Sequence, residues 1–266
     1  MKRKIGFIGG GNMAGAIIGG IISSSCADAE DILVYDKNSD ALNKLKQTYG
    51  INPDYTLFDV LKADILFLSV KPNVIYSVID EIKNNISQNT VIVSIAAGQS
   101  IEKLTNAFGM KNLKLVRVMP NTPALVGEGM SAVSVNSFVS EEDINTVMDI
   151  LKSFGKAEII PEKLMDTVTG VSGSSPAYIF MLIEAMADAA VLGGMPRNQA
   201  YTFCAQAVLG SAKMVLELPN HPGELKDMVC SPGGTTIEAV RVLENDGFRS
   251  SIMNAIDACI EKSKSM

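Results

Sequence analysis

The sequence is poor in histidine and cysteine, and both scarcities narrow the chemistry that it can support. His221 is the single histidine in 266 residues, so we expect neither a Ser-His-Asp triad nor a histidine-rich metal site. Cysteines are few and follow neither CxxC nor any zinc-like spacing, and a chain of this length does not need disulfides. We predict no metal site, and we interpret the thiols as reduced and buried in a cytoplasmic protein: Cys26, Cys204, Cys230 and Cys259.

An excess of basic residues and a long uncharged apolar run are also absent. The formal net charge is −6 and no basic stripe occurs, so nucleic acid is not an expected partner. The most apolar stretch, residues 178–195, contains Glu184 and Asp188, which is typical of a buried helix and not of a membrane span. The N-terminus imitates a signal peptide, but its five glycines between residues 6 and 15 and the polar Asn12 favour a strand, a turn and a helix. We therefore expect no membrane partner.

Short apolar runs alternate with amphipathic helices through the first part of the chain. The predicted strands are residues 4–8, 32–35, 65–70, 91–95, 113–118 and 131–135. The predicted helices are residues 13–22, 40–48, 73–84, 100–107 and 141–154. Such alternation indicates βαβ units and a parallel sheet buried on both faces. The predicted fold class is α/β, with an N-terminal Rossmann-type doubly wound sheet over residues 1–161.

The pattern changes after about residue 162, where helical periodicity continues with almost no strand signal. Long helices rich in Ala, Met and Leu are predicted over residues 176–192 and 197–217. Their apolar faces are larger than one small bundle can cover, which favours a helical dimer interface. Residues 162–266 therefore form a predicted all-α dimerisation and substrate domain, and we expect the chain to associate with itself.

The segment GFIGGGNMAG, residues 6–15, contains a dinucleotide-binding fingerprint. The pattern G-x-G-x-x-G/A maps onto Gly9, Gly11 and Ala14, which permit a tight turn, close approach of a pyrophosphate and close packing of helix on strand. The N-terminus of the following helix offers N–H groups and a partial positive charge to phosphates. We favour a dinucleotide site over a plain glycine-rich turn, with contacts from Ile8, Gly9, Gly10, Gly11, Asn12 and Met13.

Three later strand ends lie where ligands bind in sheets of this kind. Asp36 follows the second strand, where an acidic residue binds the adenine ribose and favours NAD, whereas the adjacent Lys37 could meet the 2′-phosphate of NADP. A simple turn is the structural alternative, and both cofactors stay open. The segments SVKPN (69–73) and IAAGQS (95–100) end two further strands, and Lys71 fits a cofactor contact and a surface lysine equally well.

Three further segments combine rigid or small residues with polar groups. VMPNTPALVGEG, residues 118–129, fixes the backbone around Asn121 and suits one wall of an active site or a structural crossover. GVSGSSPAY (170–178) and CSPGGTT (230–236) are predicted turns that open helices, and each could act only as a helix cap. Both turns offer N–H groups and hydroxyls without a neutralising carboxylate, which suits a small anionic ligand such as a substrate carboxylate.

Taken in order, these motifs resemble the pyrroline-5-carboxylate reductase family, which makes proline. The resemblance rests on SVKP, MPNTPALVGEG, TGVSGSSPAYIF and above all VCSPGGTTIEAVRVLE, and it extends from residue 5 to about residue 250. The family often has glycine at the position of Ala14, and the fingerprint tolerates this alanine. The resemblance implies a nucleotide-binding domain followed by a helical dimerisation domain, in an intertwined dimer that often assembles into rings of dimers.

The resemblance also implies which residues contact NADH or NADPH and the substrate. Beyond the glycine loop, the implied cofactor contacts are Asp36, Lys37, Thr56, Ser69, Val70, Lys71, Pro72, Ala96, Ala97, Gly98 and Asn121. The implied substrate contacts are Ser174, Ser231, Gly233, Gly234, Thr235 and Thr236. Thr236 would direct its hydroxyl at the ring nitrogen, and a cyclic imine is basic enough to react without the strong acid that a ketone requires.

Two alternatives belong to other classes. A β-hydroxyacid dehydrogenase resembles this chain in its glycine loop and helical second domain, but that family carries a lysine where this sequence has Ala177. A nucleotide-binding regulatory module without turnover is the second alternative, and the presence of every expected site residue argues against it only weakly.

Overall fold

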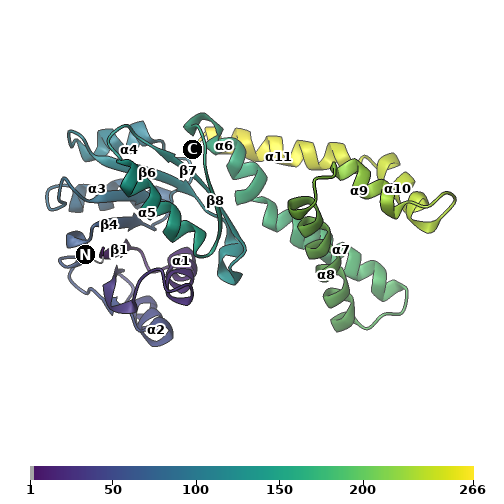
Figure 1. Cartoon of the computed structure of the whole chain (residues 1–266), viewed down its shortest axis with the longest axis horizontal. Helices are drawn as coiled ribbons and strands as arrows, with labels where there is room; N and C mark the ends of the chain where they lie inside the picture. The colour runs from purple at the N-terminus through teal and green to yellow at the C-terminus, as the bar shows by residue number, and fades with distance from the viewer. Residues whose placement is uncertain (1–2) are drawn as a thin grey trace. The chain divides into compact units, whose positions relative to one another are not determined.

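The computed structural model describes residues 3–266, which form two compact units (Figure 1). The first unit runs through Ser174 and also includes Cys259–Met266, and the second unit comprises Ser175–Ala258. The returning segment is held within the first unit by two side-chain contacts: Cys259 Sγ donates to Ser174 Oγ at 3.1 Å, and Ser263 Oγ donates to Asp166 Oδ1 at 2.7 Å. The predicted domain boundary between residues 161 and 162 stays a prediction.

The described part of the first unit contains an eight-stranded sheet in the order β3-β2-β1-β4-β5-β6-β7-β8 (Figure 1). All neighbouring strands pair in parallel except β6 and β7, which are antiparallel. The sheet extends from β1 in both directions, so β1 and β4 mark the switch point at whose carboxyl ends ligands bind. The strands are β1 Ile5–Ile8, β2 Ile32–Tyr35, β3 Asn52–Pro53, β4 Ile65–Leu68, β5 Val91–Ser94, β6 Lys114–Met119, β7 Gly129–Val135 and β8 Gly155–Ile159. The Rossmann-type fold class is confirmed.

Helices cover both faces of the sheet and enclose two apolar cores. One core packs α1 (Asn12–Ser23), α2 (Ser39–Tyr49) and α5 (Glu141–Lys152) on the sheet, and the other packs α3 (Ile75–Ile82) and α4 (Ile101–Phe108). Alternate strand residues face opposite cores, as Phe7 and Ile8 of β1 do. Phe7 stacks on Phe67 of β4 with ring centroids 4.8 Å apart. Each fully buried side chain of this size contributes about 1.5–3 kcal/mol to folding.

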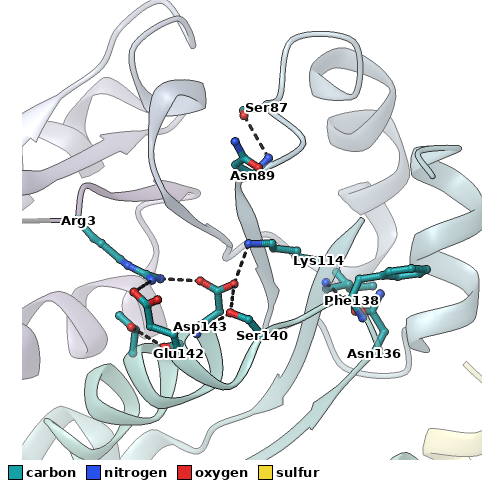
Figure 2. A network of polar contacts seen from close by, with 11 residues as sticks. Arg3, Ser87, Asn89, Lys114, Asn136, Phe138, Ser140, Glu142 and Asp143 are labelled. Atoms are coloured by element: carbon teal, nitrogen blue, oxygen red, sulfur yellow. Dashed lines mark hydrogen bonds and ion pairs between the residues drawn. The ribbon is translucent and has the colours of Figure 1, made fainter. Parts of the chain in front are cut away.

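A polar network fixes Arg3 to β6 and α5 (Figure 2). The Asp143 carboxylate, whose side chain is 6% exposed, accepts from Arg3 Nη1 at 2.7 Å, Lys114 Nζ at 2.8 Å and Ser140 Oγ at 2.7 Å. Burial disfavours the charged carboxylate, but the hydrogen bonds from these donors outweigh burial and lower the pKa of Asp143 to about 2. Glu142 binds the same arginine at 2.6 Å from an exposed position.

The second unit contains helices that bury very little of their own apolar surface. They are α7 Ser175–Leu192, α8 Arg197–Glu217, α9 Pro222–Val229, α10 Thr235–Asn245 and most of α11 Phe248–Lys264. The α7–α8 pair buries Ala187, Ala200 and Cys204, whereas Phe180 and Met181 are 64% and 68% exposed. The prediction that residues 178–195 form a buried helix is therefore wrong for the single chain, because this unit has no sheet to cover α7.

The helical stretch that contains α7 has the length and apolar composition of a membrane span. Among the described residues, Glu162–Leu192 is long and apolar enough by composition, and 11% of its most apolar window is buried within the chain. One such helix is weak evidence, since an apolar helix that packs against a second subunit has the same features. The prediction of buried cysteines holds for Cys204 but not for Cys26, which is exposed after α1.

Candidate active site

The loop between β1 and α1 has the backbone geometry that its glycines predict. Gly9 has a φ of +101°, and a Cβ atom there would lie 2.5 Å from the carbonyl oxygen of Ser69. Gly11 is the N-cap of α1 and makes no side-chain cap, and a Cβ atom at this position would meet nothing within 4 Å. The first turn of α1 contains no acidic residue. An uncapped helix N-terminus beside open space is a suitable site for a pyrophosphate.

Asp36 joins the end of β2 to this glycine loop. Its Oδ2 accepts from the backbone N–H of Gly10 at 2.7 Å, and its Oδ1 accepts from the N–H of Asn38 at 2.8 Å. Lys37 is 73% exposed, and its Nζ lies 3.8 Å from Glu81. A cavity of about 230 Å³ opens here, and its lining includes the predicted residues Ile8, Gly9, Asp36, Lys37 and Val70.

The end of β4 adds a buried polar atom that has no partner in the described chain. Ser69 Oγ is inaccessible to solvent and makes no hydrogen bond, although the Ser69 backbone N–H donates to Ile8 at 2.8 Å. Buried hydroxyls are normally paired, so this unpaired hydroxyl beside the glycine loop is an exception. Lys71 and Pro72 follow as the start of a 3₁₀ turn, with Lys71 exposed.

The loop after β5 is fixed by residues that sequence reasoning missed. Its predicted contacts are Ala96, Ala97 and Gly98, and Gly98 has a φ of +71°. The next residue, Gln99, is buried and accepts from the Tyr76 hydroxyl at 2.6 Å. Glu162 Oε1 accepts from the N–H of Ile101 at 2.7 Å and from Arg117 Nη1 at 3.0 Å. The sequence offered one sign that Arg117 has a special role, which is its charge inside the strand LKLVRV. Its partner Glu162 lies 45 residues away, too far along the chain to predict.

Thr56 lies in a loop that is organised by Asp54. Asp54 Oδ1 accepts from the N–H and the hydroxyl of Thr56 at 2.9 and 3.0 Å, and Oδ2 accepts from two further backbone N–H groups. Burial disfavours the charged form, but these hydrogen bonds outweigh burial and lower the pKa of Asp54 below its ordinary value. A second hollow of about 400 Å³ is lined by Thr56 and shares Tyr35 with the first cavity.

Asn121 is an anchor of the proline-rich loop. It is 8% exposed, its Nδ2 donates to the carbonyl of Ser172 at 3.0 Å and its Oδ1 accepts from the N–H of Met130 at 2.8 Å. These bonds fix the 3₁₀ helix Thr122–Val126 against β7 and against residues 169–173. A cofactor contact by Asn121 stays a prediction, and the structure gives its amide a positioning role.

The segment GVSGSSPAY differs from the predicted turn. Thr169–Gly173 is a π-helical turn that leads into α7, and the N–H of Ser174 donates to Thr169 at 2.8 Å. The small residues Gly170 and Gly173 therefore serve a widened helical turn and not a free helix N-terminus. Such π turns are frequent at functional sites. The Ser174 hydroxyl is occupied by Cys259 at 3.1 Å.

The second unit presents the segment CSPGGTT as the predicted uncharged turn. Gly233 has a φ of +67°, and Gly234 is the N-cap of α10 and supplies no side-chain cap. A Cβ atom at Gly234 would lie 2.3 Å from Ser231 Oγ, so a larger residue there would displace that hydroxyl. Thr235 is exposed and Thr236 is half-buried in the first turn of α10. An uncapped helix start with neighbouring hydroxyls is an arrangement that suits a small anion.

His221 is accounted for by a local role, because it caps α9. Its Nδ1 accepts from the backbone N–H of Gly223 at 3.0 Å. Among residues 3–266, no group of three or more His, Cys, Asp or Glu side chains is arranged to hold a metal ion.

Comparisons with known proteins agree with this geometry. Residues 162–266 match the family described as pyrroline-5-carboxylate reductase dimerisation, and residues 4–98 match NADP oxidoreductase, coenzyme F420-dependent. The pyrroline-5-carboxylate reductase of Escherichia coli K12 is 54% identical, over 100% of this chain and 99% of that protein. The solved reductase of Coxiella burnetii has a TM-score of 0.91 at 33% identity, covering 100% of this chain and 98% of that chain. The NADP-bound pyrroline carboxylate reductase of Plasmodium falciparum has a TM-score of 0.90 at 35% identity, covering 99% of this chain and 98% of that chain. The chain belongs to the pyrroline-5-carboxylate reductase family.

Proposed function

We propose that this protein is a pyrroline-5-carboxylate reductase. It reduces the cyclic imine of L-1-pyrroline-5-carboxylate to L-proline with NADH or NADPH, as the last step of proline biosynthesis. The observation that carries the proposal is that one chain of this family holds both a candidate dinucleotide site and a candidate substrate site. One is the Gly9–Asp36 cavity of the first unit, and the other is the uncapped start of α10 in the second.

The first unit is the proposed cofactor site. The bound dinucleotide would supply a hydride from C4 of its nicotinamide ring. The N-terminus of α1 would bind the pyrophosphate, and the Asp36 carboxylate would hold the adenine ribose. The loop from Ala96 to Gly98 would border the nicotinamide, held in place by the Glu162–Ile101 hydrogen bond.

The turn before α10 is the proposed substrate site. Gly233 and Gly234 keep side chains away so that backbone N–H groups reach the substrate carboxylate, with Ser231 and Thr235 beside them. Thr236 would hydrogen-bond the ring nitrogen and orient the imine carbon. An imine is basic and reacts as its iminium, so orientation and a hydroxyl partner replace the strong acid of ketone reduction. The helix-capping role of His221 is consistent with this chemistry.

The proposal is tested by following the absorbance of NADH and NADPH at 340 nm when pyrroline-5-carboxylate is added. Thr236→Ala should lower kcat/KM roughly ten- to a hundredfold, because one hydrogen bond of this kind contributes on the order of 1–3 kcal/mol. Thr236→Ser keeps the hydroxyl and should restore most of the activity. Thr146→Ala is the matched control, since that hydroxyl bonds only the local carbonyl of Glu142.

Three results would contradict the proposal in different ways. Full activity in Thr236→Ala would show that the Thr236 hydroxyl is not needed for the reaction. Turnover of β-hydroxyacids in place of the imine would favour the related dehydrogenases, although Ala177 stands where they carry lysine. Binding of dinucleotide without any turnover, in folded protein, would favour a regulatory module.

Self-association is part of the proposed function, because the second unit carries the family's dimerisation domain. The exposed apolar residues of α7 and α8, such as Phe180 and Phe203, need a second copy to cover them. We propose a homodimer or a ring of dimers in the cytoplasm. Sedimentation velocity gives the number of chains per particle, and a monomer at micromolar concentration would contradict this part of the proposal.

A further inference from the structure

The structure bears on which of the two dinucleotides this chain prefers. NADPH differs from NADH by a phosphate on the 2′-oxygen of the adenine ribose, and such a phosphate carries nearly two negative charges at neutral pH. The preference therefore depends on the charges at the end of β2, where the adenine ribose would lie. This question rests on the proposed function, because it concerns the cofactor of that reaction.

Asp36 places a fixed negative charge at this position. Its two oxygens accept from the N–H groups of Gly10 and Asn38 at 2.7 and 2.8 Å, so the carboxylate is tied to the glycine loop and to the residue that caps α2. It cannot rotate away without breaking both bonds. Each oxygen retains a further lone pair that can accept from a ribose hydroxyl. The same carboxylate would repel a 2′-phosphate.

The nearby lysines do not offset this charge. Among the described residues, Lys37 is the one cation that lines the first cavity, and it is exposed and lies 3.8 Å from the Glu81 carboxylate. Asp36, Lys37 and Glu81 together therefore carry a net charge of one negative unit. Lys62, at the neighbouring hollow, pairs with Asp59 at 2.8 Å and covers the ring of Phe58.

The capping residue Asn38 offers no phosphate site either. Its Oδ1 accepts from the backbone N–H groups of Asp40 and Ala41 at 2.9 and 3.4 Å, which satisfies two donors at the start of α2. These donors would otherwise attract an anion. The carboxylate of Asp40 in the first turn of α2 makes the region still less suitable for a phosphate.

We infer that Asp36, held by Gly10 and Asn38, makes this protein prefer NADH over NADPH. A relative from Plasmodium falciparum was solved with NADP bound, so the inferred preference rests on residues of this chain and not on the family. Hydride chemistry is the same for both cofactors. The discrimination is confined to the adenine end.

The direct test measures binding without turnover. Nicotinamide fluorescence is titrated with NADH and with NADPH, without substrate, for the wild-type protein, Asp36→Asn and Asp31→Asn. We expect NADH to bind at least about tenfold more tightly to the wild type, because a fixed like charge near the phosphate costs about one factor of ten or more in affinity. Asp36→Asn keeps an amide oxygen that can accept from the Gly10 N–H. In this variant the affinities for NADH and NADPH should differ by no more than about threefold.

Asp31→Asn is the matched control, because it removes the same charge at the opposite end of β2 and should leave the preference unchanged. Equal or tighter binding of NADPH by the wild type would overturn the inference, as would an unchanged ratio in a folded Asp36→Asn. Absence of turnover with a retained NADH preference in binding would refute the proposed function alone. Turnover with an NADPH preference would refute this inference alone.

Discussion

Replacing Asp143 by asparagine should destabilise the protein by an amount that depends on pH. The pKa of this carboxyl falls from an ordinary 3.8 to about 2 in the folded chain. One pKa unit corresponds to 1.36 kcal/mol, so ionised Asp143 contributes about 2 kcal/mol to the free energy of unfolding at pH 7. The side chain is only 6% exposed, so solvent screening reduces this value little.

The sign follows from the depressed pKa. The stabilisation is fully present above the unfolded value near pH 4 and is lost as the pH falls through about 2. About half of it should remain at pH 3. Urea unfolding of the wild type and Asp143→Asn at pH 7, 4 and 3 gives the difference directly.

Glu142→Gln provides the control, because Glu142 binds the same Arg3 but its side chain is 83% exposed. An exposed ion pair contributes about 0–1 kcal/mol, so this variant should unfold almost as the wild type does. The reasoning is refuted if Asp143→Asn costs the same at pH 7 and pH 3. It is also refuted if the two variants are equally destabilised.

Four further variants can be checked with the same unfolding and binding assays. Gly9→Ala should lower the free energy of unfolding by more than about 1 kcal/mol because of its positive φ. Gly11→Ala replaces the N-cap glycine of α1, should lower stability by at most about 1 kcal/mol, and should weaken NADH binding, measured by fluorescence. Glu162→Gln should cost about 1–3 kcal/mol in urea unfolding, since it leaves the buried Arg117 without a charged partner. Asp54→Asn should destabilise at pH 7, and the loss should fade below pH 4 because the folded pKa is depressed, which unfolding at several pH values measures.

Hydrophobic pattern alone predicted most of the sheet. The strand at Ile32–Tyr35 and the helix at Arg197–Glu217 were predicted with the bounds that the structure has. The pattern missed β3, which is two residues long, and β8, whose GKAEI carries two charged side chains. It also predicted a parallel sheet, whereas β7 is antiparallel to β6, because pairing direction depends on the connection and not on the strand's own residues.

Some features of the candidate site are set by the local sequence, and others depend on residues far apart in the chain. Glycine conformation and helix starts are local, so the tight turn at Gly9 and the start of α1 after Gly11 are confirmed as their motif predicts. The orientation of Asn121 toward Ser172 could not be predicted, because its partner lies 51 residues away. Burial of α7 was predicted wrongly because the pattern records that a face is apolar but not which chain covers it.

The return of Cys259–Met266 to the first unit makes the helical unit an insertion with both of its ends tethered. If residues 175–258 lost their structure while the sheet stayed folded, they would form a closed loop and not a free tail. A closed loop has fewer conformations than a free segment of equal length, so the tether disfavours local melting by an entropic effect of the kind that a crosslink produces. Cleavage of the backbone near residue 258 would abolish this effect without altering a single side chain.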